Sequence, residues 1–243
     1  MPRPPLTVER LQPFIGEVVY DPYGRVLGKL VSMESDVDGT VNTIVVETET
    51  RTINFVPAEA VDIKDGRVVV WPEWKTLAYS VIASYQRALK RLRGLEDMYS
   101  RNEIPSTVYR EMRKKLDKSL EKLKEEAKKL KALIAKRKND IEDENLKLDR
   151  AIANLKMSYL AGEINEKAYK IAIEHLRNAK DSNARELEDL KETKSRIESL
   201  ESGAVEFVRK HEEEKAPEPA KTEPPAPSVP TATQPIPVKL IEG

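Results

Sequence analysis

Two clusters of basic residues carry side chains that could bind an anionic partner. One cluster falls within residues 87–93 and the other within residues 128–138. Grouped Lys and Arg side chains can neutralise the phosphates of nucleic acids or of anionic lipids. Glu125 and Glu126 favour the alternative that these residues form a solvated helix face. The candidate phosphate or lipid contacts are Arg87, Lys90, Arg91, Arg93, Lys128, Lys129, Lys131, Lys136, Arg137 and Lys138.

Catalytic chemistry has little support in the residue types present. His175 and His211 are the two histidines, both in segments expected to be helical, and the chain has no cysteine. The sequence contains no nucleophile–base pair, phosphate-binding loop or cluster with metal-ligand spacing. We therefore expect a protein that is not an enzyme and that carries neither a metal nor a cofactor.

A short apolar segment, residues 236–243, is the candidate partner-binding site. It follows the Pro-rich residues 216–235, which are typical of a disordered linker. In an extended strand, Ile236, Val238 and Leu240 would share one face. Such a segment can bind by adding a strand to the edge of a partner's sheet. The candidate contacts are Ile236, Pro237, Val238, Lys239, Leu240 and Ile241.

The composition favours helices that would position these segments. Of 243 residues, 35% are charged, 5% are aromatic and 9 are glycine, which is typical of a coiled coil and not of a compact globule. The net charge is zero, yet residues 1–74 are acidic overall and residues 75–215 are basic. There is no apolar run long enough to span a bilayer. We therefore expect a cytoplasmic protein whose membrane contact would be peripheral.

Residues 1–74 predict a small β-barrel. Short apolar runs at 17–20, 25–33, 43–47, 51–56 and 68–71 are separated by turn sequences, and Gly28 is expected where a strand bends or two backbones approach closely. The run Ile15 to Asp21, followed by Gly24 and by Gly28 to Leu30, resembles the PRC-barrel family. That resemblance implies a non-catalytic interaction module.

Residues 75–215 predict long antiparallel coiled-coil hairpins. Apolar residues at intervals of three, four and seven indicate helices over 75–101, 106–160 and 166–212. Turns are expected near 102–105 and 161–165. Pro105 is expected to open the second helix, Gly162 to end it and Asn165 to cap the third. The fold class is therefore mainly α, with a β domain before the hairpins and a disordered tail after them.

An internal repeat supports the two turns. Five residues around the first turn recur 60 positions later, so each copy is expected to form a hairpin tip on which two tyrosines pack. The first copy is Tyr99, Glu103, Ile104, Tyr109 and Leu116, and the second is Tyr159, Glu163, Ile164, Tyr169 and Leu176.

The second hairpin can be assigned a register. If the facing positions sum to about 328, Asn145 faces Asn183, and a single Asn pair in an apolar seam fixes register. Replacing both with Leu is then expected to raise thermal stability and loosen the register. Lys180 and Lys194 lie near this seam, so one hairpin would bury little apolar surface. We therefore expect association with further copies, as a dimer or a filament.

The order of the parts, together with the terminal run from Pro235 to Ile241, resembles the CdvA family of archaeal cell-division proteins. The resemblance implies a scaffold that assembles at the division site at midcell, peripheral to the membrane. It also implies that residues 236–243 bind ESCRT-III, by adding a strand to the winged-helix domain of the partner CdvB. The alternative is a coiled-coil protein that organises DNA through its basic patches, without sequence specificity.

Overall fold

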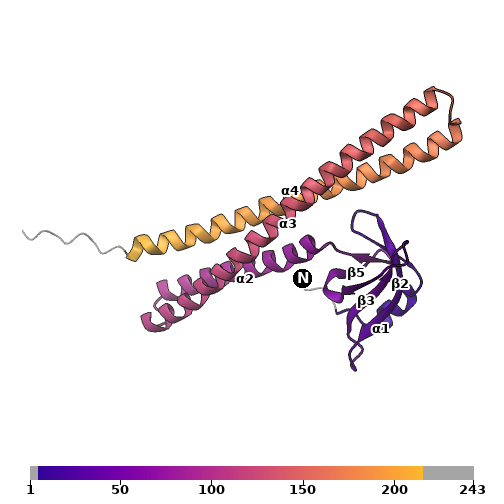
Figure 1. Ribbon diagram of the computed structural model, residues 1–243. Helices are drawn as coiled ribbons and strands as arrows, with labels where there is room; N and C mark the ends of the chain where they lie inside the picture. Colours follow the sequence, from indigo (N-terminus) through magenta and orange to yellow (C-terminus); the bar gives the residue numbers. More distant parts are fainter. Residues whose placement is uncertain (1–4, 216–243) are drawn as a thin grey trace, which may run out of the picture. The chain divides into compact units, whose positions relative to one another are not determined.

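The computed structural model (Figure 1) describes residues 5–215, with side chains through Ala204. The chain divides into one compact unit of residues 1–205 and a second of residues 206–243. The sheet, α2, α3 and all the described side chains of α4 belong to the first unit. None of the helices in residues 5–215 has an apolar stretch sufficient to cross a membrane.

A six-stranded sheet forms the N-terminal part of the chain. In the order β4-β3-β2-β1-β6-β5, neighbouring strands pair antiparallel except for β1 and β6, which are parallel. Two short helical turns precede the sheet and a third lies between β4 and β5. The elements are α1 (Val8–Leu11), η1 (Gln12–Phe14), β1 (Val18–Tyr20), β2 (Val26–Ser35), β3 (Val41–Glu47), β4 (Ile53–Pro57), η2 (Ala58–Ala60), β5 (Val61–Lys64) and β6 (Arg67–Val70).

The sheet surrounds one apolar core, to which alternate residues of most strands contribute. Leu30, Ile44 and Val68 are almost completely buried, together with Leu11 from α1. The expected β domain is confirmed, but among the described strands β4 and β5 remain two open edges, so the barrel is not closed. The strand β5 was not predicted, because its four residues include Asp62 and Lys64 and lack a clear apolar alternation.

Gly28 confirms the expected close backbone approach in β2. Its φ is +152°, and a Cβ atom built at this position would lie 2.2 Å from the carbonyl oxygen of Glu47 in β3. No side chain fits at that distance, so glycine is required here.

Three long helices follow the sheet: α2 (Glu73–Ser100), α3 (Ser106–Leu160) and α4 (Glu166–Lys215). In Figure 1, α2 runs back along the first half of α3, and α4 runs back along α3 from its C-terminal end and beyond its middle, where Lys131 of α3 pairs with Glu201 of α4. The bounds of α3 are those that the sequence predicted. α2 begins two residues earlier than expected, directly after Pro72, which occupies its N-cap position.

The two hairpin tips confirm the repeat at the level of backbone geometry. Asn102 and Gly162 occupy equivalent positions with φ of +57° and +74°. The first tyrosine of each copy stacks on the second, with ring centroids 4.2 Å apart in the first tip and 4.4 Å in the second. Asn165 caps α4, since its Oδ1 accepts a 2.9 Å hydrogen bond from the backbone N–H of Ala168.

The two halves of α3 are buried to different extents. In the first half, where α2 also packs, Leu123 and Leu130 are buried, as are Val81 and Tyr85 of α2. In the second half, where α4 is the neighbouring helix, the seam residue Leu148 is only half-buried. A third helix therefore completes the core in one half of α3 and is missing from the other half within the described chain.

Candidate functional site: a polar clamp between the sheet and the helices

The carboxylate of Glu186 in α4 lies at the centre of a polar cluster that joins four elements. Its side chain is 1% exposed. Arg137 of α3 donates to both carboxylate oxygens, through Nε at 2.8 Å and Nη2 at 2.9 Å. Arg25, between β1 and β2, donates through Nη1 at 2.6 Å, and the indole Nε1 of Trp74 in α2 donates at 3.3 Å. We call this arrangement of Arg25, Trp74, Arg137, Asn183 and Glu186 the clamp.

The turn between β1 and β2 holds Arg25 in position. Oδ1 of Asp21 accepts hydrogen bonds of 2.8 Å from the backbone N–H groups of Tyr23 and Arg25. Oδ2 of Asp21 accepts a third, also at 2.8 Å, from Nη1 of Arg25. Gly24 supplies the positive φ of +89° that this turn requires. The sequence therefore predicts the turn, whereas the role of Arg25 appears only in the structure.

Asn183 connects the register of the hairpin to the position of the sheet. Its side-chain amide donates a 2.9 Å hydrogen bond to Oδ1 of Asn145, which confirms the predicted pairing of these residues. Its own Oδ1 accepts a 2.7 Å hydrogen bond from Nη2 of Arg25. The neighbouring Ser182 donates through Oγ to the carbonyl oxygen of Tyr23 at 3.0 Å. The predicted register residue is thus also a docking residue for the β1–β2 turn.

The two arginines of the clamp neutralise the buried charge of Glu186. Burial would raise the pKa of Glu186, but hydrogen bonds from Arg137 and Arg25 outweigh this and leave the pKa below its usual value of 4.5. The same hydrogen bonds with Glu186 raise the pKa of Arg137. Glu186 is therefore ionised at neutral pH and binds two cations, Arg137 from α3 and Arg25 from the β1–β2 turn.

A second contact reinforces the clamp one helical turn along α4. Asp189 accepts a 2.7 Å hydrogen bond from the hydroxyl of Tyr23 and forms an ion pair with Lys75 of α2. Burial and the hydrogen bond to Asp189 raise the pKa of Tyr23, so its hydroxyl stays protonated and remains a donor. Tyr23 itself is 5% exposed.

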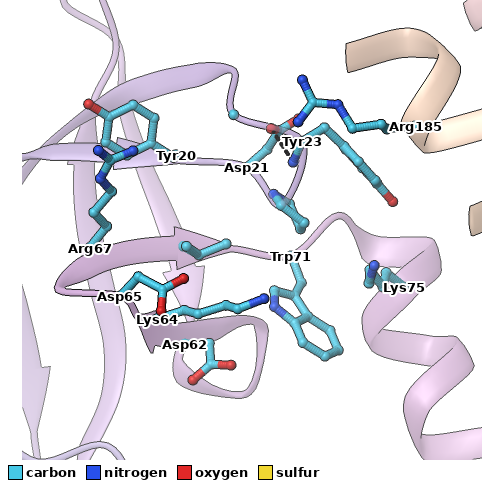
Figure 2. Close-up of a pocket in the computed structure, with 13 residues that line it drawn as sticks. Tyr20, Asp21, Tyr23, Asp62, Lys64, Asp65, Arg67, Trp71, Lys75 and Arg185 are labelled. Carbon is cyan, nitrogen blue, oxygen red and sulfur yellow. Dashed lines mark hydrogen bonds between the residues drawn. The ribbon is translucent and has the colours of Figure 1, made fainter. Parts of the chain in front are cut away.

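An open cleft of about 720 Å³ borders the clamp (Figure 2). Arg67 lies over the ring of Tyr20, 5.3 Å from its centroid, and Arg185 of α4 reaches toward the opposite rim. Asp62 and Asp65 alternate with the basic residues along the lining, so the charge favours neither an anionic nor a cationic ligand. Within residues 5–204, no group of three His, Asp or Glu side chains comes together to hold a metal ion.

The basic clusters predicted from the sequence differ in what surrounds them. The cluster on α2 is exposed, and Arg87 also donates a 3.0 Å hydrogen bond to Ser84. In the cluster on α3, Arg137 belongs to the clamp and Lys131 forms an ion pair with Glu201 of α4. Lys138 lies 3.4 Å from Glu142. The exposed members of the two clusters are Arg87, Lys90, Arg91, Arg93, Lys128, Lys129, Lys136 and Lys138.

The terminal peptide, residues 236–243, and its Pro-rich linker lie outside the described residues, so the binding role of Ile236 to Ile241 stays a prediction. The docking residues Arg25 and Glu186 were not predicted from the sequence. These residues are 161 positions apart, and neither belongs to a motif. Of the clamp residues, only Asn183 could be singled out from the sequence, because the heptad pattern pairs it with Asn145 in the seam.

Comparison with known proteins identifies the helical part of the chain. The family described as a CdvA-like coiled-coil domain matches residues 73–220. A relative named Cell division protein A, from Sulfolobus acidocaldarius, is 38% identical over 202 residues, which cover 83% of this chain and 84% of the relative. The family match includes all of α2, α3 and α4, and with them four of the five clamp residues. On these two findings, the chain belongs to the CdvA family.

Proposed function

We propose that this protein is a non-enzymatic cell-division scaffold. It assembles with further copies at the division site, in the cytoplasm and peripheral to the membrane. There it recruits an ESCRT-III homologue of the CdvB type through its C-terminal peptide. The observation that carries the proposal is the similarity to Cell division protein A, which extends over 83% of the chain and so includes more than the coiled coil.

The described structure suits a scaffold in two respects. First, the clamp joins the sheet to the middle of the α3/α4 hairpin, so an interaction module would be held at a defined place on a long helical element. Second, α3 alone has 55 residues and so spans about 80 Å at 1.5 Å per residue. A long helix can hold binding partners apart, and a docked sheet can present a binding surface. Neither role requires a reactive group.

The recruiting step rests on the terminal sequence. In this proposal the Pro-rich residues 216–235 act as a spacer before the apolar peptide, and an extended peptide gains main-chain hydrogen bonds when it adds to a sheet edge. Ile236, Val238 and Leu240 would then enter pockets on one face of the partner. Pro237 is compatible with this mode if its nitrogen points away from the partner strand.

A binding titration tests recruitment. The full chain is titrated against a CdvB-type winged-helix domain, and Leu240→Asp is compared with Thr231→Asp, a matched charge in the linker. We expect binding in the micromolar range that Leu240→Asp abolishes and Thr231→Asp leaves within about twofold. Absence of binding by the wild-type chain would refute the recruiting role.

Organisation of DNA is the second candidate function, favoured by the exposed basic residues on α2 and α3. Contacts of this kind are independent of sequence and weaken steeply as salt rises. Deleting residues 229–243 separates the two functions, because it removes the peptide and leaves every basic residue of the helices in place. Under the scaffold proposal the deletion abolishes CdvB binding. Under the alternative, DNA binding persists after the deletion and is lost between about 50 and 200 mM salt.

A further inference from the structure

The surface of α3 that faces away from α4 changes character along the helix. The outward positions follow one another at alternating steps of four and three residues, beginning at residue 111. From 111 to 143 all of them are exposed, and all are polar except Ala132. The polar residues are Glu111, Lys115, Lys118, Lys122, Glu125, Lys129, Lys136, Asn139 and Asp143. From residue 146 onward the outward positions are apolar, apart from Arg150. Their exposed fractions are 57% for Leu146, 64% for Met157 and 85% for Leu160, and Ala153 is exposed as well. We call these four residues the distal stripe.

The distal stripe is distinct from the seam that α3 forms with α4. Ile141, Leu148 and Leu155 face α4, and residues 146, 153 and 160 each lie five positions after one of them. Five residues correspond to a rotation of about 140° beyond one full turn, which directs the stripe away from α4. The polar outward residues before Leu146 show that a solvent-facing surface of this helix is ordinarily charged.

The spacing of the distal stripe specifies a helical partner. Leu146, Ala153 and Leu160 are separated by exactly one heptad, the interval at which one helix meets another along a supercoil. The small side chain of Ala153 lies in the middle, where it allows two helix backbones to approach closely. A lipid surface requires a wide apolar face but no heptad interval, and here Asp149 and Arg150 flank the stripe.

The arrangement is also self-complementary. When a second copy of α3 lies antiparallel to the first with Ala153 on the two-fold axis, each Leu146 faces Leu160 of the other copy. A surface whose two halves are equivalent in this way suits an isologous contact, the kind found in two-fold symmetric dimers. Two copies of the stripe are enough to form this contact, and no other segment of the chain is required.

The last part of α3, from Leu148 onward, also lacks the cover that the first half has, although Ile141 nearer the middle of the helix is fully buried. Leu123 and Leu130 are buried where α2 packs as a third helix, whereas Leu148 and Ile152 remain half-buried where only α4 is present. A second copy would supply two more helices at that place. Further apolar burial there is favourable at about 25 cal/mol per Å² of apolar surface removed from water.

We propose that the distal stripe, Leu146, Ala153, Met157 and Leu160, is a dimerisation surface that binds the distal stripe of a second copy in antiparallel orientation. The inference rests on the proposed self-assembly and names the surface at which it occurs. Since the overlap covers only the last 15 positions of α3, the two copies extend away from each other. Their α2–α3 turns would be about 140 Å apart, from the rise of 1.5 Å per residue.

Disulfide trapping tests this geometry, because the chain has no native cysteine. Ala153→Cys places one thiol from each copy beside the two-fold axis, within the Cα separation of about 7 Å that a disulfide tolerates. We expect a covalent dimer under mild oxidation. Ala132→Cys is the matched control, since it is an exposed alanine on the same surface but outside the stripe, and it should form no disulfide-linked dimer.

Sedimentation velocity separates a failure of this inference from a failure of the proposed function. Leu146→Asp with Leu160→Asp should weaken self-association at least tenfold, while Ala132→Asp leaves it unchanged; circular dichroism checks that helix content is retained. If the wild type associates but neither the trapping nor the Asp substitutions have an effect, the stripe is not the interface and self-assembly stands. A wild type that stays monomeric at all concentrations would overturn both.

Discussion

The side-chain amide of Asn183 donates a 2.9 Å hydrogen bond to the side-chain oxygen of Asn145 across the seam of α3 and α4. Oδ1 of Asn183 accepts a hydrogen bond from Nη2 of Arg25. The same residue therefore contacts both the opposite helix of the hairpin and the β1–β2 turn. An Asn pair that only fixed register would be dispensable for stability. This pair is connected through Arg25 to the buried carboxylate of Glu186. Substituting Asn183 should therefore affect the stability of the fold as well as the register.

Asn183→Leu should lower the free energy of unfolding by about 1–3 kcal/mol, because Arg25 and Asn145 each lose a hydrogen-bond partner. From the sequence alone, replacing both Asn residues with Leu was expected to raise stability. The contact with Arg25 reverses that expectation for the single substitution. Urea denaturation measures the change, and Asn178→Leu, an exposed position on α4, is the control. An Asn183→Leu variant as stable as the wild type would contradict the docking role.

Glu186→Gln should destabilise the chain at neutral pH by about 2 kcal/mol, since two cations lose their buried counter-charge. The pKa of Glu186 is lowered in the folded state, so its contribution is present above pH 4.5 and is lost as the pH falls through the folded value. The difference between wild type and variant should therefore shrink below that pH. Unfolding at pH 7, 5 and 3.5 measures it, with the exposed Glu192→Gln as control. An equal difference at all three pH values is the contrary result.

Gly28→Ala should cost at least about 2 kcal/mol, because the new Cβ would collide with the Glu47 carbonyl and the backbone is in a region that favours glycine. Gly94→Ala is the matched control. Gly94 lies inside α2 with open space around it, so alanine there should stabilise the chain by up to about 1 kcal/mol. Thermal melting of the two variants should shift in opposite directions, and a shift in the same direction would argue against the close approach.

Gly162→Ala should destabilise the second hairpin by about 1 kcal/mol, because alanine avoids the positive φ of this turn. Asn102→Gly at the equivalent position of the first hairpin should be neutral or slightly stabilising, as glycine adopts that φ without strain. The pair tests whether the two tips are equivalent. Melting temperatures that fall equally in both variants would show that the tips do not share one backbone design.

The helices and their turns could be predicted because their signals are local. Heptad spacing defines the seam, while Pro105, Gly162 and Asn165 mark the ends of helices within a few residues of where they act. The Asn145–Asn183 pairing could also be predicted, because the short turn at 161–165 leaves a single offset by which two helices can align. Local sequence patterns thus determined most of the helical architecture.

The clamp could not be predicted, because its residues are brought together by tertiary structure. Arg25 in isolation is one arginine after a turn, and Glu186 is one of many acidic residues on a helix rich in charge. Only the docking of the sheet turns this glutamate into a buried carboxylate. The strand β5 was missed for a related reason, since its polar residues are stabilised by pairing with β6 and not by an alternation of their own.

The polar contacts along the α3/α4 hairpin have a mechanical consequence. They form rungs between two antiparallel helices: Lys131 with Glu201, Arg137 with Glu186, Asn145 with Asn183 and Asp149 with Lys180. A pull directed along the helices loads these rungs in shear, so that they resist together, whereas a pull that separates the helices at one end breaks them one after another. The hairpin is thus strong along its own axis and weak across it.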